Sequence, residues 1–131
     1  VIKPICESEE QAKMQAIIGC EMYVAENHDK QERDYDHLVL LCKNKKGYKN
    51  LIKLDSIAYV DGFYYKPRID KDVLRMYSDG LICLSACLAG EVQYRLMNND
   101  YEGAKSEALA LSEIFGPGNF YLELQDHHLR Y

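Results

Sequence analysis

Short apolar runs separated by segments of helical periodicity place the strongest limit on how this chain can fold. Strand-like runs occupy residues 16–25, 37–43 and 120–125, and a fourth at 81–92 leads through small residues into a helix. Apolar runs of this length, bounded by polar or turn-forming residues, are typical of strands. Short helices between such strands are typical of an α/β fold, so we expect mainly parallel strands with intervening helices.

Helical segments are predicted between and around these runs, at 8–15, 44–60, 71–79 and 101–115. Asp70 and Asp100 stand directly before two of them, where a carboxylate can cap the free backbone N–H groups. Gly80 is expected to end the helix that Asp70 begins. Residues 61–70 are expected to form an extended loop, because Pro67 forces the residue before it out of helical geometry.

The composition fits one domain at most, or a piece of one. The chain has 131 residues, of which 47% are hydrophobic and 28% charged, so it can build a core. Its net charge of −5 argues against the segment being a main nucleic-acid-gripping surface, but leaves room for a role inside a larger nucleic-acid enzyme. No apolar run is long enough to span a membrane, and the missing initiator Met indicates a cut from a longer chain.

The five cysteines are odd in number, and several lie in apolar runs. This pattern favours reduced thiols and a cytoplasmic location over a disulfide framework, and no Cys-x-x-Cys pair occurs that would indicate a zinc ribbon. The cysteines are Cys6, Cys20, Cys42, Cys83 and Cys87.

Three side chains could carry chemistry. Glu21 stands in the apolar run "AIIGCEMYVAE", where burial of an unpaired carboxylate would be costly, although it could simply point outward from an edge strand. His37 opens a strand and could be a surface histidine, while Cys87 follows a strand and could be a buried structural thiol. Taken together, Glu, His and Cys are competent ligands for zinc-like ions, and β/α barrels collect functional groups from the ends of several strands.

Five blocks, in order, carry a family resemblance. The blocks "IIGCEMYVA", "HLVLLCKNKKGYKNLIKL", "GFYYKPRID", "GLICLSACLAGEV" and "FYLELQDH" resemble the polymerase and histidinol phosphatase (PHP) domain of bacterial DNA polymerase III alpha subunits. The similarity runs from about residue 16 to residue 128. It implies part of a distorted β/α barrel with a metal cluster at one mouth, and it implies that Glu21, His37 and Cys87 are metal ligands. Coordination to an ion would then explain a carboxylate in an apolar strand.

Other parts of the family pattern are absent. The chain lacks the family's His-x-His motif near the polymerase start, the Asp-His pair that follows it, and a later Asp-x-His expected beyond this chain's end. It also lacks the polymerase palm with its catalytic aspartates. Residues 1–15 match poorly, His128 stands where the family usually has glycine, and we assign no role to His127. We therefore expect residues 1–131 to be a single incomplete domain, an interior slice of a PHP domain with no catalytic residue of its own.

The resemblance implies a part of a DNA-directed DNA polymerase that acts in chromosome replication, with DNA, deoxynucleotides and other replisome subunits as partners. The parent would use magnesium for nucleotide transfer, and its PHP domain would use zinc or manganese for phosphodiester hydrolysis, or serve as a scaffold. The slice alone is expected to be inactive as a polymerase, to hold no ion or one at partial occupancy, and to self-associate through exposed strand edges.

Two other functions stay open. The chain could belong to a free-standing PHP phosphoesterase of the histidinol-phosphatase type, although the blocks "GYKNLIKL" and "FYYKPRID" favour the polymerase. It could also be a purely structural or interaction module. A polymerase palm in the flanking sequence would decide against the first, and lack of metal in a complete domain would favour the second.

Overall fold

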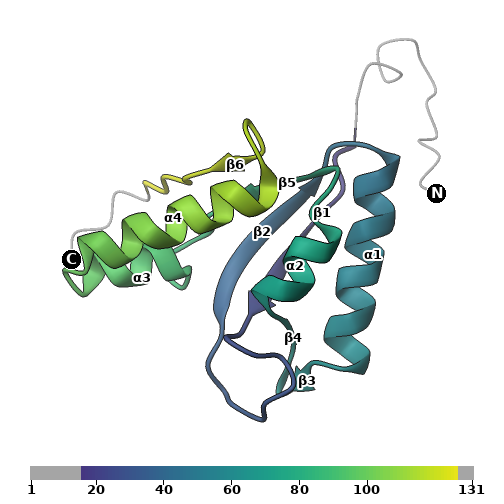
Figure 1. Ribbon diagram of the computed structural model, residues 1–131, viewed down its shortest axis with the longest axis horizontal. Helices are drawn as coiled ribbons and strands as arrows, with labels where there is room; N and C mark the ends of the chain where they lie inside the picture. The colour runs from purple at the N-terminus through teal and green to yellow at the C-terminus, as the bar shows by residue number, and fades with distance from the viewer. Residues whose placement is uncertain (1–15, 127–131) are drawn as a thin grey trace.

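A mixed sheet flanked by helices makes up residues 16–126, the part of the chain that this computed structural model describes (Figure 1). The strands are β1 (Gly19–Val24), β2 (Asp36–Cys42), β3 (Phe63–Tyr64), β4 (Lys66–Ile69), β5 (Leu81–Leu84) and β6 (Phe120–Tyr121). The helices are α1 (Lys45–Val60), α2 (Lys71–Tyr77), α3 (Glu91–Met97) and α4 (Tyr101–Phe115). The expected α/β class is confirmed, while the helix expected at 8–15 lies outside the described residues.

The strand order is β3-β4-β1-β2-β5-β6. β4, β1, β5 and β6 run in one direction, as expected, but β2 runs antiparallel to both of its neighbours. The direction reverses because the loop at 25–35 between β1 and β2 contains no helix, and a parallel connection would need a crossover. Among residues 16–126, β3 and β6 remain as unjoined edges, so the expected barrel is not confirmed.

The stretch 61–70 is not the extended loop that its proline suggested. It forms a short antiparallel pair, β3 with β4, across a turn in which Tyr65 adopts a φ of +61°. β4 then pairs in parallel with β1, with Arg68 opposite Tyr23. The expectation was wrong because pairing with a distant strand, which local sequence does not reveal, decides whether an extended segment becomes a strand.

The core lies on one face of the sheet. Alternate residues of β1, β2 and β5 point into it and meet the apolar stripes of the helices. Its members include Met22, Val24, Leu38, Leu40 and Cys83 from the sheet, and Leu51, Leu54, Leu74, Leu111 and Phe115 from the helices. The residues between them, such as Glu21, Tyr23 and Val39, lie on the other face and are exposed or half-buried. Only one face of the sheet is therefore closely packed by the described helices.

The predicted helix caps are present. Asp70 accepts a hydrogen bond from the Val73 N–H, and Asp100 accepts one from the Gly103 N–H. At the start of α1, Gly47 packs directly on Gly80, and a Cβ atom at position 47 would lie 1.8 Å from the Gly80 carbonyl oxygen. This close approach fixes the start of α1 against the turn that follows α2. Between residues 16 and 126 there is no helix with the length and apolar character needed to cross a bilayer.

We expect Leu54→Ala to lower the free energy of unfolding by about 2–5 kcal/mol, because Leu54 is fully buried and its loss leaves a cavity. Ile52, two residues away on the same helix, is 48% exposed and provides a matched control. Urea unfolding of both variants measures the difference. Equal destabilisation by Leu54→Ala and Ile52→Ala would contradict the packing described here.

Candidate functional site

Glu21 and His37 meet on the open face of the sheet. In the β1–β2 pair His37 lies opposite Tyr23 and Glu21 lies opposite Val39, so both side chains point to the same side. The His37 Nδ1 atom is 3.3 Å from Glu21 Oε1. This diagonal contact across the two strands brings the first two predicted ligands together.

Cys87 reaches the same place from the loop after β5. The His37 N–H donates a hydrogen bond of 2.9 Å to the Ala89 carbonyl, which ties this loop to the start of β2. Within the loop, the Gly90 N–H donates to the Cys87 carbonyl at 2.9 Å. The Cys87 Sγ atom then lies 3.8 Å from His37 Nδ1. Glu21 and Cys87 thus each approach the same nitrogen of His37, at 3.3 Å and 3.8 Å.

The environment of Glu21 differs from the buried strand that its apolar neighbours suggested. Its side chain is 49% exposed, because Glu21 points to the face of the sheet that the described helices do not cover. Nor is β1 an edge strand, since it lies between β4 and β2. The cost of burying a carboxylate in an apolar core therefore does not arise here.

Two tyrosines fix the plane of the His37 ring. Tyr23 meets it edge-on, with ring centroids 5.2 Å apart and planes at 73°. Tyr35 lies nearly parallel to it, at 6.3 Å and 7°. These contacts restrict the direction in which Nδ1 points, which is how neighbouring groups position a metal-binding histidine.

Two pairs of donor atoms have the spacing that a zinc-like ion requires. One pair is Glu21 with His37, and the other is His37 with Cys87. Two ligands on a tetrahedral zinc ion, with bonds of about 2.0 to 2.3 Å, lie about 3.3 to 3.8 Å apart. The Glu21–His37 and His37–Cys87 separations, 3.3 Å and 3.8 Å, fall in that range. Between residues 16 and 126, however, no group of three or more His, Cys, Asp or Glu side chains is arranged to hold one ion. The residues therefore fit a metal by type and by pairwise spacing.

Comparison with known proteins shows the family. The family model of the PHP domain matches residues 3–127. The chain belongs to the PHP domain family. The match begins earlier than the blocks that carried the resemblance, and it takes in most of the first fifteen residues.

Relatives of this PHP domain are bacterial polymerase subunits. DNA polymerase III subunit alpha of Borreliella burgdorferi is 48% identical over 125 residues, covering 91% of this chain and 11% of the relative. Those of Treponema pallidum and Chlamydia trachomatis are 44% identical over 131 residues and 43% identical over 123 residues, covering 95% and 89% of this chain and 11% and 10% of the relatives. The chain therefore spans about a tenth of the length of these relatives.

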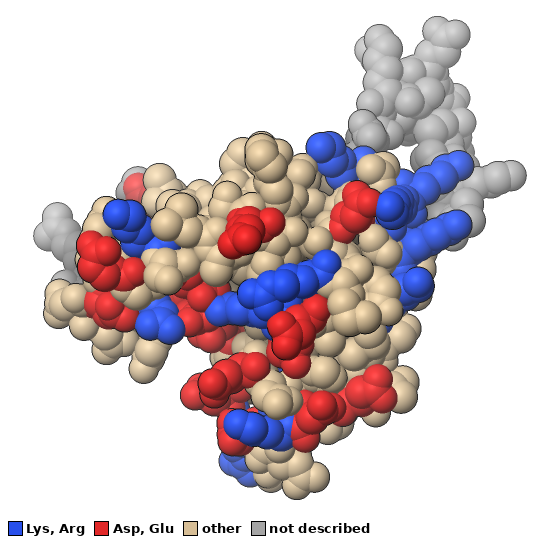
Figure 2. All heavy atoms as spheres, in the orientation of Figure 1, with Lys and Arg blue, Asp and Glu red and all other residues tan. Residues whose placement is uncertain are grey.

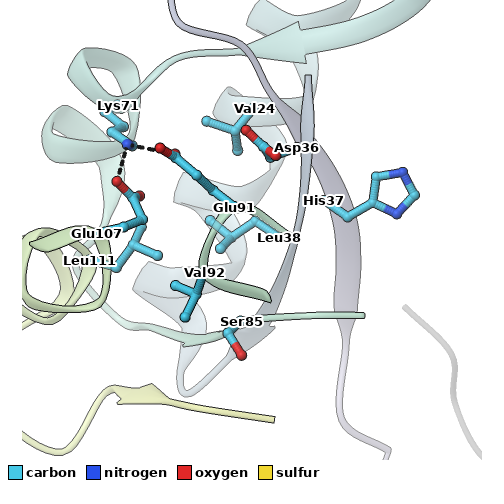
Figure 3. Close-up of a pocket in the computed structure, with 10 residues that line it drawn as sticks. All are labelled: Val24, Asp36, His37, Leu38, Lys71, Ser85, Glu91, Val92, Glu107 and Leu111. Carbon is cyan, nitrogen blue, oxygen red and sulfur yellow. Dashed lines mark hydrogen bonds and ion pairs between the residues drawn. The ribbon is translucent and has the colours of Figure 1, made fainter. Parts of the chain in front are cut away.

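A second polar cluster lies on the packed side of β2. Lys71, at the start of α2, donates hydrogen bonds to Glu107 at 2.5 Å and to Glu91 at 3.0 Å. Arg95 also forms an ion pair with Glu91, at 2.6 Å. We call Lys71, Glu91, Arg95 and Glu107 the Lys71 network. Figure 3 shows Lys71, Glu91 and Glu107 together, and His37 pointing away from them. The network joins α2, α3 and α4 but is separate from the candidate metal ligands.

Charge in the Lys71 network is unevenly compensated. Burial, together with the carboxylates of Glu91 and Asp34, raises the pKa of Asp36 to about 6. Burial also raises the pKa of Glu107 above its ordinary value. Burial alone would lower the pKa of Lys71, but its two carboxylate partners outweigh that effect and raise it. Asp36, which lines the same cleft as Lys71, Glu91 and Glu107, therefore carries a charge that is costly to hold at neutral pH.

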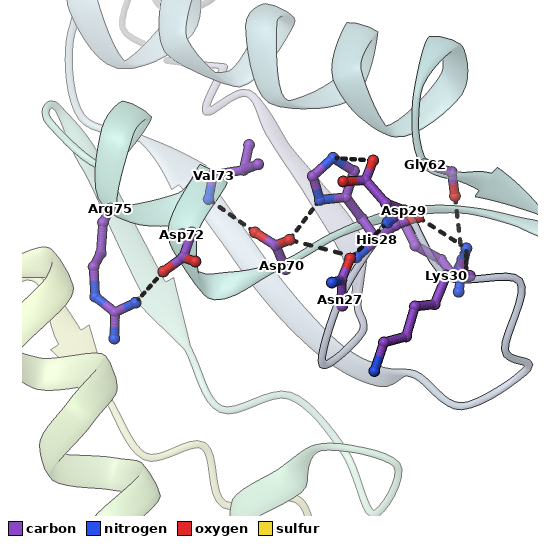
Figure 4. Close-up of polar contacts among 10 residues, drawn as sticks. Asn27, His28, Asp29, Lys30, Gly62, Asp70, Asp72, Val73 and Arg75 are labelled. Atoms are coloured by element: carbon purple, nitrogen blue, oxygen red, sulfur yellow. Dashed lines mark hydrogen bonds and ion pairs between the residues drawn. The ribbon is translucent and has the colours of Figure 1, made fainter.

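The loop at 25–35, which leads to His37, is held by Arg68 of β4 and by Asp70 directly after that strand. Figure 4 shows the contact of Asp70 with His28 in this loop. Arg68 is 1% exposed and donates hydrogen bonds to the carbonyls of Glu32, His28 and Lys30 in the loop, at 2.6 to 3.1 Å. Asp70 Oδ2 forms a hydrogen bond of 2.5 Å with His28 Nδ1. Burial alone would raise the pKa of Asp70, but hydrogen bonds from the Val73 N–H and from His28 lower it below its ordinary value.

Sequence reasoning missed the Lys71 network and the Arg68 contacts. A signal for the first exists in α4, where Glu107 falls on the same helical stripe as Ala104, Leu111 and Phe115, all of which are buried. A carboxylate on a buried stripe requires a partner. Of the other residues singled out from the sequence, Cys6, His127 and His128 lie outside the described residues, and Cys20, Cys42 and Cys83 are free thiols.

We expect Asp36→Asn to stabilise the PHP domain at pH 7.5 by about 1 to 2 kcal/mol, allowing for solvent screening. The pKa of Asp36 rises from 3.8 to about 6 on folding, so the penalty for its charge is complete above pH 6 and disappears below about pH 4. The advantage of the variant should therefore shrink as the pH falls from 7 to 4. Chemical unfolding across this range in EDTA measures it, with Asp61→Asn, at an exposed position that does not act on Asp36, as the control. An advantage independent of pH would contradict the assignment.

Proposed function

We propose that this PHP domain binds a catalytic divalent metal, zinc or manganese, through Glu21, His37 and Cys87, and that it forms part of a DNA polymerase III alpha subunit. The observation that carries the metal centre is the position of His37 Nδ1, within 3.3 Å of a carboxylate and 3.8 Å of a thiol. The relatives named DNA polymerase III subunit alpha support the wider assignment.

Each side chain must be in a particular protonation state to bind the ion. His37 must present an unprotonated Nδ1 and carry its proton on Nε2, and the flanking Tyr23 and Tyr35 rings keep that nitrogen directed at Glu21 and Cys87. Cys87 must give up its thiol proton to bind as a thiolate. Because protons and the ion compete for the same donor atoms, metal affinity should fall with falling pH. When bound, the ion would supply a Lewis acid for phosphodiester hydrolysis.

The parent protein would carry out template-directed DNA synthesis with magnesium in the bacterial cytoplasm, together with other replisome subunits. That chemistry needs palm carboxylates for two ions, and the chain contains no motif for them. We therefore infer that the segment alone does not extend a primer. Template-directed synthesis by the isolated chain in a primer-extension assay would refute this.

A scaffold role is the second candidate, favoured by one observation. Among residues 16–126 the ligands approach one another in pairs and do not form a group of three around one position. A domain that keeps ligand-type residues for structure would look similar. Metal analysis of the complete protein separates the two functions, since a scaffold would contain no bound ion.

We expect full-length protein carrying this segment to contain about one equivalent or more of zinc or manganese after dialysis. His37→Gln, Glu21→Gln and Cys87→Ser should each remove at least about half of it, because each deletes one of about three protein ligands. Glu26→Gln is the matched control, because Glu26 is exposed and is not one of the three candidate ligands. Elemental analysis by mass spectrometry measures the content.

Metal content that none of the three changes affects would refute the centre. For the 131-residue chain alone we expect no ion or partial occupancy, with Glu21→Ala changing almost nothing. Stoichiometric metal in the chain alone, lost on Glu21→Ala, would instead show that these residues need no further ligands.

A further inference from the structure

The beginning of α1 concentrates positive charge in an acidic chain. The whole chain has 16 Lys and Arg residues against 21 Asp and Glu, yet residues 43–53 contain five lysines and no acidic residue. Figure 2 shows basic side chains gathered over the upper end of α1, on its outer side. We refer to these five residues together as the lysine surface. They are Lys43, Lys45, Lys46, Lys49 and Lys53.

Some of these lysines are already engaged within the domain. Lys46 pairs with Asp79, Lys43 donates to Asn119 at 3.1 Å, and the Lys53 ammonium lies 5.2 Å from the Tyr77 ring centroid. Lys45 and Lys49, by contrast, are exposed and form no hydrogen bond or ion pair within the part of the chain that the structure describes. They stand one helical turn apart, a rise of about 6 Å, so both can reach one extended partner.

The helix itself adds to this field. α1 begins at a cap in which Asn44 accepts the Gly47 N–H, and its first turn carries no Asp or Glu. The positive end of the helix dipole is therefore not neutralised by a carboxylate in that turn. The lysine surface and the helix end together attract anions.

We infer that the lysine surface binds the phosphodiester backbone of nucleic acid, without reading its sequence. Flexible ammonium groups act as point charges toward phosphates and carry no base-specific pattern. The surface is separate from the candidate metal ligands, because α1 packs on the core face through Leu51 and Leu54 while Glu21 and His37 occupy the opposite face. It therefore serves as a docking contact, independent of whether the metal centre exists.

The charge of the surface favours a polyanion over a protein partner. Protein interfaces depend on a few anchors that fill well-packed pockets. The clefts around the Lys71 network include no residue of 43–53 in their lining. Tyr48 and Ile52 are 42% and 48% exposed beside the lysines and are the apolar groups available there. A surface rich in lysine is complementary in charge to a phosphodiester backbone that lies along it.

Binding of the chain to a fluorescent 20-base-pair duplex, followed by anisotropy in EDTA from 50 to 200 mM salt, tests the inference. EDTA removes the metal centre from the experiment, so the result is independent of the proposed function. We expect binding at 50 mM salt that does not depend on duplex sequence. Lys45→Glu combined with Lys49→Glu should weaken it roughly tenfold or more, and should reduce the slope of log K against log salt by about 2.

Lys30→Glu combined with Lys105→Glu is the matched control, because both lysines are exposed, lie away from α1, and give the same change in net charge. Circular dichroism confirms that both double variants fold. Retained binding in this control, with loss in the α1 variant, supports the inference. No binding by the unmodified chain, or equal loss in both variants, would overturn it. Tighter binding of a polyglutamate peptide than of the duplex would also overturn it, in favour of an acidic protein partner.

Discussion

The burial of Arg68 against backbone carbonyls is the constraint on which the candidate site depends. Arg68 is 1% exposed. Its guanidinium forms no ion pair with a carboxylate among residues 16–126, and donates instead to the Gly62 carbonyl and to three carbonyls of the loop at 25–35. A buried charge is tolerated only when its donors are satisfied, and the carbonyls would be left unpaired without it. The loop in turn joins β1 to β2, so its shape determines the register that places His37 opposite Tyr23.

Local features of the fold could be predicted from sequence because their causes are local. The caps at Asp70 and Asp100 and the helical stripe of α1 each depend on residues within a turn or two of one another. Strand direction and the β3–β4 pair could not be predicted in this way. They depend on partners far along the chain, such as Tyr23 opposite Arg68, and on the shape of a loop that Arg68 holds from outside.

Two carboxylates interrupt apolar patterns in the sequence, and the folded structure leaves one exposed and buries the other. Glu21 sits among apolar neighbours in sequence, yet it points to the open face and stays half exposed. Glu107 lies on the buried stripe of α4 and is 7% exposed, compensated by Lys71, which is 36 residues away in sequence. Family resemblance singled out Glu21 as a candidate ligand, whereas Glu107 was not singled out from the sequence. The two cases differ in the face that each side chain takes, which the sheet decides for Glu21 and the buried stripe of α4 decides for Glu107.

Consecutive residues of β2 point to opposite sides of the sheet, so Asp36 faces the Lys71 network while His37 faces Glu21 and Cys87. The first side is packed, and Lys71 and Arg95 balance part of its negative charge. On the second side, the charges lie beside half-buried apolar residues such as Val39 and Leu84. An ion would balance the charges, and additional protein would cover the apolar residues and exclude water, which strengthens the attraction between ion and ligands. One further layer of structure over this face would satisfy both requirements.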